Sequence, residues 1–179
     1  MIAPTQDLRL NLSPKLLGST SVMTNDNSTQ YGRAIHALTP YSLPADFGNH
    51  SHRFISQLCH DLSIAAWNTV DVNDAFISVL ETAIDDHMEG HGNQLFDPSK
   101  LIPGLIAVCG EFVIHKYGGR WICVRNPILP ENEPWVCDAS EQYYPAFIAA
   151  HTFNETEEGV SVRAVIQDIT SSRSRRYPY

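Results

Sequence analysis

Apolar residues recur at helical spacing along much of this chain of 179 residues. The pattern predicts a helix over 52–67 and another over 73–88, because apolar side chains three and four positions apart form one stripe on each. The longest apolar segment, 97–124, predicts a helix that is buried on most sides, a stop at two glycines and a strand that carries Trp121. We expect the other elements to pack around this segment.

The central helix carries its own start and stop signals. Asp97 is a favourable N-cap, and Pro98 suits the first helical position, where no N–H is needed. Pro103 conflicts with so early a start, because a proline inside a helix removes one hydrogen bond and clashes with the preceding turn. We therefore expect the regular helix to start at Pro103, after a short turn. Gly118 and Gly119 predict a left-handed C-terminal stop.

One narrow face of this helix is less apolar than the rest. Its members follow one another at intervals of three or four positions: Lys100, Gly104, Ala107, Glu111 and His115. Glu111 and His115 could act as an acid/base pair. The interpretation that we favour is a solvent-facing stripe in which these two residues form an ion pair one helical turn apart.

The segments after the central helix predict a small antiparallel sheet and further helices. Residues 120–124 have the pattern of a strand covered on both faces, and 135–137 supply a partner strand across a long proline-bearing loop. A helix is predicted over 143–153. The segment 160–169 fits both a strand and a helix, and we favour a helix over 161–170.

These elements predict an α+β fold in which helices pack on a small antiparallel sheet, with an irregular N-terminal arm. The arm is expected over 1–49, because its sequence is rich in Ser, Thr, Asn and Pro and poor in periodicity. A single α+β domain follows over 50–170. The polar, basic stretch 171–179 predicts a disordered tail.

Composition and charge narrow the class of partner. A formal net charge of -8 argues against nucleic acid and against an anionic membrane surface, and it is compatible with a basic protein partner. No stretch approaches the roughly 20 apolar residues of a membrane span, and the first residues lack the features of a signal peptide. Four widely spaced cysteines favour free thiols in a reducing cytoplasm: Cys59, Cys109, Cys123 and Cys137.

The acidic residues are unevenly distributed along the chain. Two intervals, 54–99 and 126–162, contain several carboxylates and no Lys or Arg. One interpretation is a solvated acidic surface that keeps the protein soluble, and the other is a face that captures a basic partner. On the second interpretation, the candidate partner-binding residues are Asp85, Asp86, Glu89, Glu155, Glu157 and Glu158.

Motifs for catalysis are sparse. His87 and His91 stand four positions apart, a spacing that can hold one metal ion on a helix, and they define the alternative of a metal-dependent enzyme. The chain has no nucleophile elbow, no phosphate-binding glycine loop and no dinucleotide-binding motif. We therefore expect neither an enzyme nor a bound cofactor, and we favour a polar helix end over a metal site at these histidines.

The run from Leu105 to Trp121, LIAVCGEFVIHKYGGRW, resembles small bacterial domains of the toxin-immunity kind. In these domains an apolar helix ending in a Gly-Glu segment leads through a glycine-rich turn to a strand that bears a Trp. A further strand, the Tyr144-Pro145 pair and a closing helix follow in a similar order. The resemblance implies an α+β fold and a non-catalytic cytosolic binder of a toxin, and it assigns no functional residue.

The function that these features favour is that of a non-enzymatic cytoplasmic binding protein, an immunity protein that neutralises a cognate bacterial toxin by direct binding. Two alternatives stay open at this point. One is the metal-dependent enzyme that would use His87 and His91, and the other is a structural adaptor subunit of a larger assembly.

Overall fold

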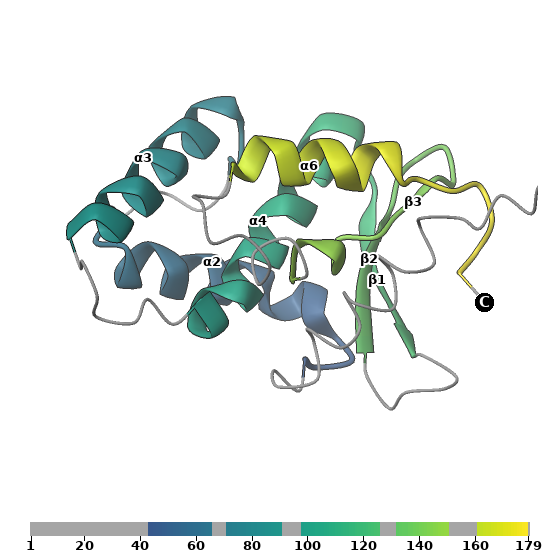
Figure 1. Cartoon of the computed structure of the whole chain (residues 1–179). Coiled ribbons are helices and arrows are strands. Elements are labelled where there is room, and N and C mark those ends of the chain that lie inside the picture. Colours follow the sequence, from purple (N-terminus) through teal and green to yellow (C-terminus); the bar gives the residue numbers. More distant parts are fainter. Residues whose placement is uncertain (1–42, 66–70, 91–97, 126–131, 151–160, 179) are drawn as a thin grey trace, which may run out of the picture.

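The computed structural model describes residues 43–65, 71–90, 98–125, 132–150 and 161–178, which fold into helices and one antiparallel sheet (Figure 1). The helices are α2 (Phe47–Asp61), α3 (Asp74–Gly90), α4 (Pro98–Tyr117) and α6 (Val162–Ser171). The strands are β1 (Arg120–Arg125), β2 (Asn132–Cys137) and β3 (Tyr143–Tyr144), in the sheet order β1-β2-β3. This architecture confirms the predicted α+β fold.

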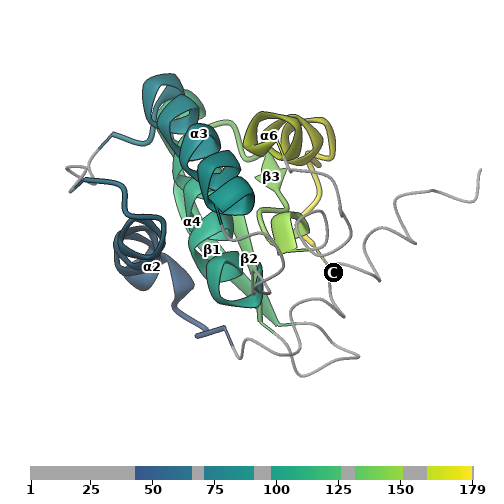
Figure 2. The same cartoon turned by 60° about the vertical axis from the view of Figure 1, so that its left-hand side comes forward.

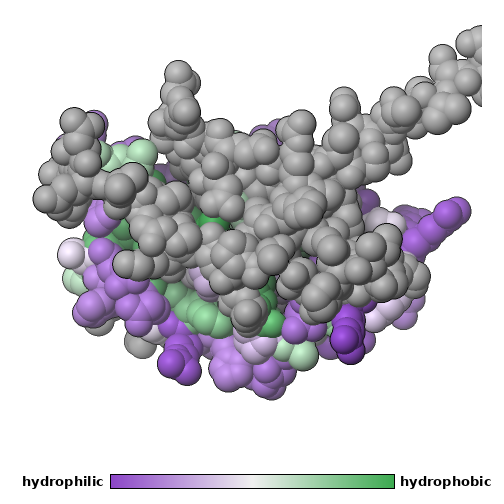
Figure 3. Space-filling view, turned by 60° about the horizontal axis from the view of Figure 1, so that its bottom comes forward, coloured by the Kyte–Doolittle hydropathy of each residue, from purple (hydrophilic) through white to green (hydrophobic). Residues whose placement is uncertain are grey.

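α4 lies in the middle of the arrangement. It contacts α2, α6 and β2, while α2 also contacts β1 and α3 contacts α6 (Figure 1, Figure 2). Its buried side chains confirm the prediction of burial on most sides: Leu101, Ile102, Leu105, Ile106, Ala107, Val108, Cys109, Phe112 and Val113. Figure 3 turns the bottom of Figure 1 toward the viewer. Most of the described residues at the rim of this face are hydrophilic, and hydrophobic residues are visible inside the rim.

The start of α4 differs from the prediction. The helix begins at Pro98, so the expected start at Pro103 is wrong. Pro103 lies within the first two turns, where its missing N–H removes a single hydrogen bond. Leu101 and Ile102, just before it, are 5% and 0% exposed, and burying such a side chain contributes about 1.5–3 kcal/mol. Their burial outweighs the local loss. Asp97, the predicted N-cap, lies outside the described residues.

The stripe predicted to face solvent on α4 turns largely inward. Gly104 and Ala107 are buried, Glu111 is half-buried and His115 is exposed. A Cβ atom on Gly104 would lie 2.6 Å from the Cβ atom of Leu58 in α2, so this face lets the two helices approach closely. The prediction was wrong because a face of small residues can serve a close helix contact as well as an exposed surface.

Trp121 of β1 lies where α2, α4 and the sheet meet. A Cβ atom on Gly110 would come within 1.9 Å of its Cη2 atom, and one on Gly48 within 2.5 Å of its Cβ atom. The indole therefore occupies space that two glycines leave open. The indole N–H has a hydrogen-bond acceptor in Glu111. Glu111 Oε1 accepts hydrogen bonds from Trp121 Nε1 at 2.7 Å and from Ser51 Oγ at 2.6 Å. We call this arrangement the Trp121 interlock.

The turn from α4 into the sheet follows the prediction. Gly118 and Gly119 have φ angles of 72° and 113°, in the region that favours glycine, and the Gly118 N–H donates to a carbonyl of the last helical turn. β1 then pairs antiparallel with β2 in a register that sets Trp121 opposite Val136. The predicted hairpin is confirmed, with β2 beginning earlier than expected.

Further boundaries in the structure also differ from those predicted. α2 begins at Phe47, which is fully buried, so the folded domain starts before residue 50. Tyr143 and Tyr144 pair with the edge of β2 and so belong to a strand rather than to the start of a helix. The tail predicted to be disordered is anchored, because Tyr143 and Ser174 exchange backbone hydrogen bonds at 2.8 and 2.9 Å.

The outer helices follow the apolar pattern. α6 spans Val162–Ser171, as favoured, and the Ser161 hydroxyl caps its first turn by accepting a backbone N–H at 3.3 Å. The side chain of Asn73 caps α3 in the same way, accepting two backbone N–H groups of the first turn.

The predicted N-terminal arm, up to residue 42, lies outside the described residues.

Asp138 fixes the turn between β2 and β3. Its carboxylate accepts the backbone N–H groups of Ser140 and Gln142 at 2.8 and 2.9 Å, and the hydroxyl of Tyr144 at 2.9 Å. Burial alone would raise the pKa of the Asp138 carboxyl, but these hydrogen bonds and the charge of Arg173 bring that pKa below its usual value. Burial and the hydrogen bond from its hydroxyl to Asp138 raise the pKa of Tyr144 to about 12.

Replacing Gly110 with Ala should destabilise the protein by about 1–3 kcal/mol, because the added methyl group overpacks against Trp121. In an unconstrained helix the same change stabilises by about 1 kcal/mol. Urea unfolding of wild type and variant measures the difference. The control is Gly110→Ala in a Trp121→Leu background, where the steric conflict is relieved and the destabilisation should shrink. A Gly110→Ala protein more stable than wild type would contradict the interlock.

Asp138 should make the stability of the fold fall in acid. Because its folded pKa lies below the unfolded value, its contribution is complete at neutral pH and is lost as the pH falls through the usual aspartate range toward the folded pKa. An Asp138→Asn variant should therefore be less stable at pH 7 and lose less stability between about pH 6 and pH 3. Urea midpoints across this range test the prediction, and equal acid slopes for the two proteins would contradict it.

Candidate binding surface

α3 carries a line of polar and mostly acidic residues along one outer side. Its members recur at intervals of three and four positions and so share one face of the helix: Asp74, Ser78, Glu81, Asp85 and Glu89. The apolar residues on the other side are buried: Phe76, Ile77, Leu80 and Ile84. Because packing fixes this apolar side against the core, the acidic line must point outward.

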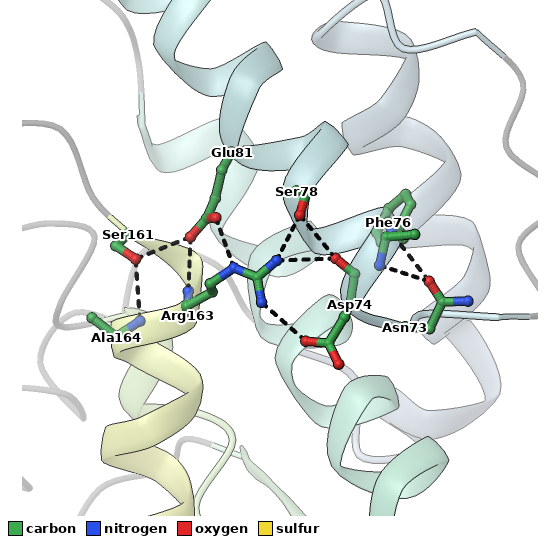
Figure 4. Close-up of polar contacts among 9 residues, drawn as sticks. Asn73, Asp74, Phe76, Ser78, Glu81, Ser161, Arg163 and Ala164 are labelled. Atoms are coloured by element: carbon green, nitrogen blue, oxygen red, sulfur yellow. Dashed lines mark hydrogen bonds and ion pairs between the residues drawn. The ribbon is translucent and has the colours of Figure 1, made fainter.

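Arg163 of α6 neutralises the first half of this line (Figure 4). Its Nη1 atom lies 2.9 Å from Asp74 Oδ1, its Nε atom lies 3.2 Å from Glu81 Oε2, and its Nη2 atom donates to Ser78 Oγ at 2.6 Å. Glu81 Oε1 also accepts hydrogen bonds from Ser161 Oγ and from the backbone N–H of Arg163, both at 3.0 Å. These contacts join the start of α6 to the first half of α3.

The second half of the line and the adjacent Asp86 have no such partner among the described residues. Asp85, Asp86 and Glu89 are exposed, and none forms an ion pair within the described part of the chain. Like charges one turn apart repel, and carboxylates near a helix C-terminus oppose its dipole, each effect costing about 0.2–1 kcal/mol. We call these three residues the acidic end of α3. The helix dipole and mutual repulsion both act against its charges, and it lies away from the start of α6 (Figure 1).

A groove lies along the neighbouring side of α3. One wall is the segment 62–65, which follows α2, and the other is a face of α3 whose residues recur at helical spacing: Val79, Thr82, Ala83 and Asp86. The groove has a volume of about 660 Å³, and Val79 is 39% exposed within it. We call it the α2–α3 groove. Its lining mixes apolar and polar side chains, and it includes one carboxylate from the acidic end.

The structure brings together only part of the predicted partner-binding set. Asp85, Asp86 and Glu89 share one helix end. The second predicted acidic cluster lies outside the described residues: Glu155, Glu157 and Glu158. The acidic end of α3 is therefore the part of the predicted surface whose geometry is known.

The alternative metal site has one described residue. His87 is half-buried and lines the α2–α3 groove, whereas His91 lies outside the described residues. Among the residues that the structure describes, no group of three or more His, Cys, Asp or Glu side chains is placed to hold a metal ion. A metal site at His87 and His91 therefore stays the alternative that the described residues leave untested.

The predicted pairing of Glu111 with His115 is wrong for the described part of the chain. Glu111 is half-buried and accepts hydrogen bonds from Trp121 and Ser51 on a single carboxylate oxygen, whereas His115 is exposed. The indole N–H and the hydroxyl are donors that a carboxylate satisfies well, because bonds to a charged acceptor are strong. Glu111 therefore orients Trp121 and contributes to folding.

The cysteines are free, as predicted. Cys59, Cys109 and Cys137 are buried, and Cys123 is half-buried. Burial raises the pKa of the Cys109 thiol to about 12 and that of the Cys123 thiol to about 11, and it also raises the pKa of Cys59. A thiol with so high a pKa stays protonated at neutral pH and is a poor nucleophile.

Comparison of the chain with protein families, with characterised proteins and with solved structures found no significant match. In the segments that the structure describes, no helix combines the length and the apolar character that crossing a membrane requires. The function must therefore be inferred from the surface of the molecule and from its inner contacts.

Sequence reasoning missed Arg163 and the α2–α3 groove. Asp74 and Arg163 are 89 positions apart, so only the packing of α6 on α3 shows which carboxylates are neutralised. Val79 offered a weak signal, because on a helical projection it falls away from the buried residues of α3. Its exposure depends on where the chain after α2 lies, which the local pattern does not encode.

Arg163→Met should destabilise the protein by about 1 kcal/mol, because exposed ion pairs contribute about 0.2–1 kcal/mol and Arg163 makes two. Arg163→Lys should recover only part of this loss, since one ammonium group cannot span Asp74 and Glu81. Urea unfolding measures both, and added salt should reduce the difference. Arg175→Met, at an exposed arginine with no ion pair among the described residues, is the matched control. An equal effect at the two positions would contradict the assigned role.

Proposed function

We propose that this chain is a binding protein without catalytic activity of its own, which captures a basic protein partner on the acidic end of α3. The kind of protein that we propose is a cytoplasmic immunity protein that neutralises a bacterial toxin by direct binding. The observation that carries the proposal is the division of the acidic line. Arg163 pairs with its first half, whereas Asp85 and Glu89 of its second half, and the adjacent Asp86, are exposed without an ion pair in the described part of the chain.

Long-range attraction supports a basic partner. The chain has a formal net charge of -8, and the acidic end concentrates three carboxylates within about one helical turn. Such a field raises association rates by about 10–10³-fold for a partner of opposite charge, and it disfavours nucleic acid and other acidic proteins. A basic rim around the active site of a toxin is a surface that this field would attract.

The position of these charges supports a role in binding rather than in folding. Glu89 lies in the last turn of α3, where the helix dipole disfavours a negative charge, and Asp85 lies one turn before it, where the two carboxylates repel. Carboxylates that served solubility alone would be better placed near a helix N-terminus, where the dipole favours them. An attractive partner would offset both unfavourable effects.

The non-catalytic part of the proposal rests on the inner polar groups. The thiols of Cys109 and Cys123 are held protonated by burial, and Glu111 is engaged by two donors that hold Trp121 in place. These groups serve the fold, and they lie on α4 and β1 rather than on α3. Free thiols also fit the reducing compartment that we propose.

Association with a cognate basic toxin should be fast at low salt and slow markedly as salt rises. Exposed charges act through a field whose range is about 10 Å at 0.1 M salt and shorter above that. Between about 50 and 500 mM salt, we expect the on-rate to fall at least about tenfold and the off-rate to change less. Surface plasmon resonance on the full chain measures both.

Charge reversal locates the contact. Asp85→Lys/Asp86→Lys should lower the on-rate at least about tenfold at low salt and leave stability within about 0.5 kcal/mol of wild type. Glu141→Lys/Asp168→Lys is the matched control, because it changes the net charge equally at two exposed residues near β3 and at the far end of α6 (Figure 1). Equal effects of the two variants would place the contact elsewhere, and no binding at all would refute the proposed function.

A further inference from the structure

We propose that the α2–α3 groove receives an apolar side chain of the partner, carried on a segment whose basic residues meet the acidic end of α3. This inference rests on the proposed function and deepens it, because it names the chemistry of the segment that binds. The acidic end attracts the partner, and the groove holds it.

The groove and the acidic end form one continuous surface. Val79, Thr82 and Asp86 follow one another at intervals of three and four positions, so one face of α3 leads from the apolar lining directly to a carboxylate. Asp86 belongs to both, because it lines the groove and is part of the acidic end. A ligand seated in the groove therefore lies beside negative charge at one end.

Apolar exposure on α3 supports an anchoring role. In the described part of the chain, large hydrophobic side chains are exposed at Val79, Met88 and Tyr177, and the first two lie on α3 at 39% and 37%. Tyr177 packs edge-on against Tyr143 at a ring-centroid distance of 5.5 Å, so it has a structural contact. Val79 lines the groove, where a partner could bury it together with the half-buried Ile64.

The size and charge of the groove select the occupant. A volume of about 660 Å³ lies within the roughly 300–1,000 Å³ typical of ligand pockets, so the groove can admit one large side chain and part of its backbone. Its apolar lining calls for an aliphatic or aromatic anchor of the kind that dominates binding energy at interfaces. Asp85, Asp86 and Glu89 at one end call for Lys or Arg on the same segment. The occupant is thus a basic segment with an apolar anchor.

The two parts of the surface should affect different rate constants. Exposed charges at the rim act mainly on the encounter, and therefore on the on-rate. A buried apolar anchor acts after the encounter and therefore sets the off-rate. The off-rate is also the rate constant that differs most between related complexes. This separation lets the groove be tested independently of the acidic end.

The test measures binding of the cognate basic toxin to three full-length variants. Val79→Ser removes apolar lining from the groove, and Thr82→Trp fills it with a ring from an exposed position. We expect each to raise the off-rate at least about tenfold and to leave the on-rate within about twofold. Met88→Ser is the matched control, because Met88 is similarly exposed on the same helix and is not among the groove residues, so both rates should stay unchanged.

A photo-crosslinking amino acid in place of Val79 tests the chemistry of the occupant. Mass spectrometry of the crosslinked product should identify a partner segment that contains an apolar residue next to Lys or Arg. A crosslinked segment without basic residues would overturn the proposed occupant. Urea unfolding of each variant confirms that it is folded before its rates are compared.

The outcomes separate this inference from the function on which it rests. Binding that weakens with Asp85→Lys/Asp86→Lys but not with Val79→Ser or Thr82→Trp would retain the proposed function and overturn the groove as anchor. An equal rise in off-rate for Met88→Ser would also overturn the groove, since general apolar exposure would then explain the effect. Failure of the wild type to bind would overturn both proposals.

Discussion

The close approach of Trp121 to two helices is the constraint on which the rest of the fold depends. Its indole fills space that Gly48 of α2 and Gly110 of α4 leave open, and a side chain at either glycine would overlap it. The indole N–H needs a partner inside this contact, and Glu111 provides one while also accepting from Ser51. A single polar group thereby joins two helices and the first strand, and the packing around α4 follows from their fixed positions.

α3 is held by a different kind of contact, and this difference leaves it available for binding. Its inner side is buried in the core, and its first half is joined to α6 by the exposed ion pairs of Arg163. Beyond Glu81 no ion pair engages the outward face within the described chain, and the carboxylates of Asp85 and Glu89 are exposed. The same helix therefore contributes to the core on one side and offers charge and an apolar groove on the other.

The sequence predicted the elements better than their ends. Apolar periodicity gave α2, α3, α4 and α6 because a helix must turn its apolar stripe toward a core, and this requirement is local. The Gly118-Gly119 stop was predictable because positive φ angles favour glycine. Pro103 misled because its local effect is small beside the burial of its neighbours, and Tyr143 misled because its strand depends on the edge of β2.

The sequence by itself determined the α+β class, the central place of α4 and the clustering of Asp85, Asp86 and Glu89, since each follows from residue types within a few turns. The tertiary structure decided which polar groups meet. Ser51 and Glu111 are 60 positions apart, and Arg163 and Asp74 are 89 apart, so no local pattern could pair them. The physical reason is that propensity and periodicity act over a few residues, whereas hydrogen bonds, ion pairs and grooves depend on how distant helices pack.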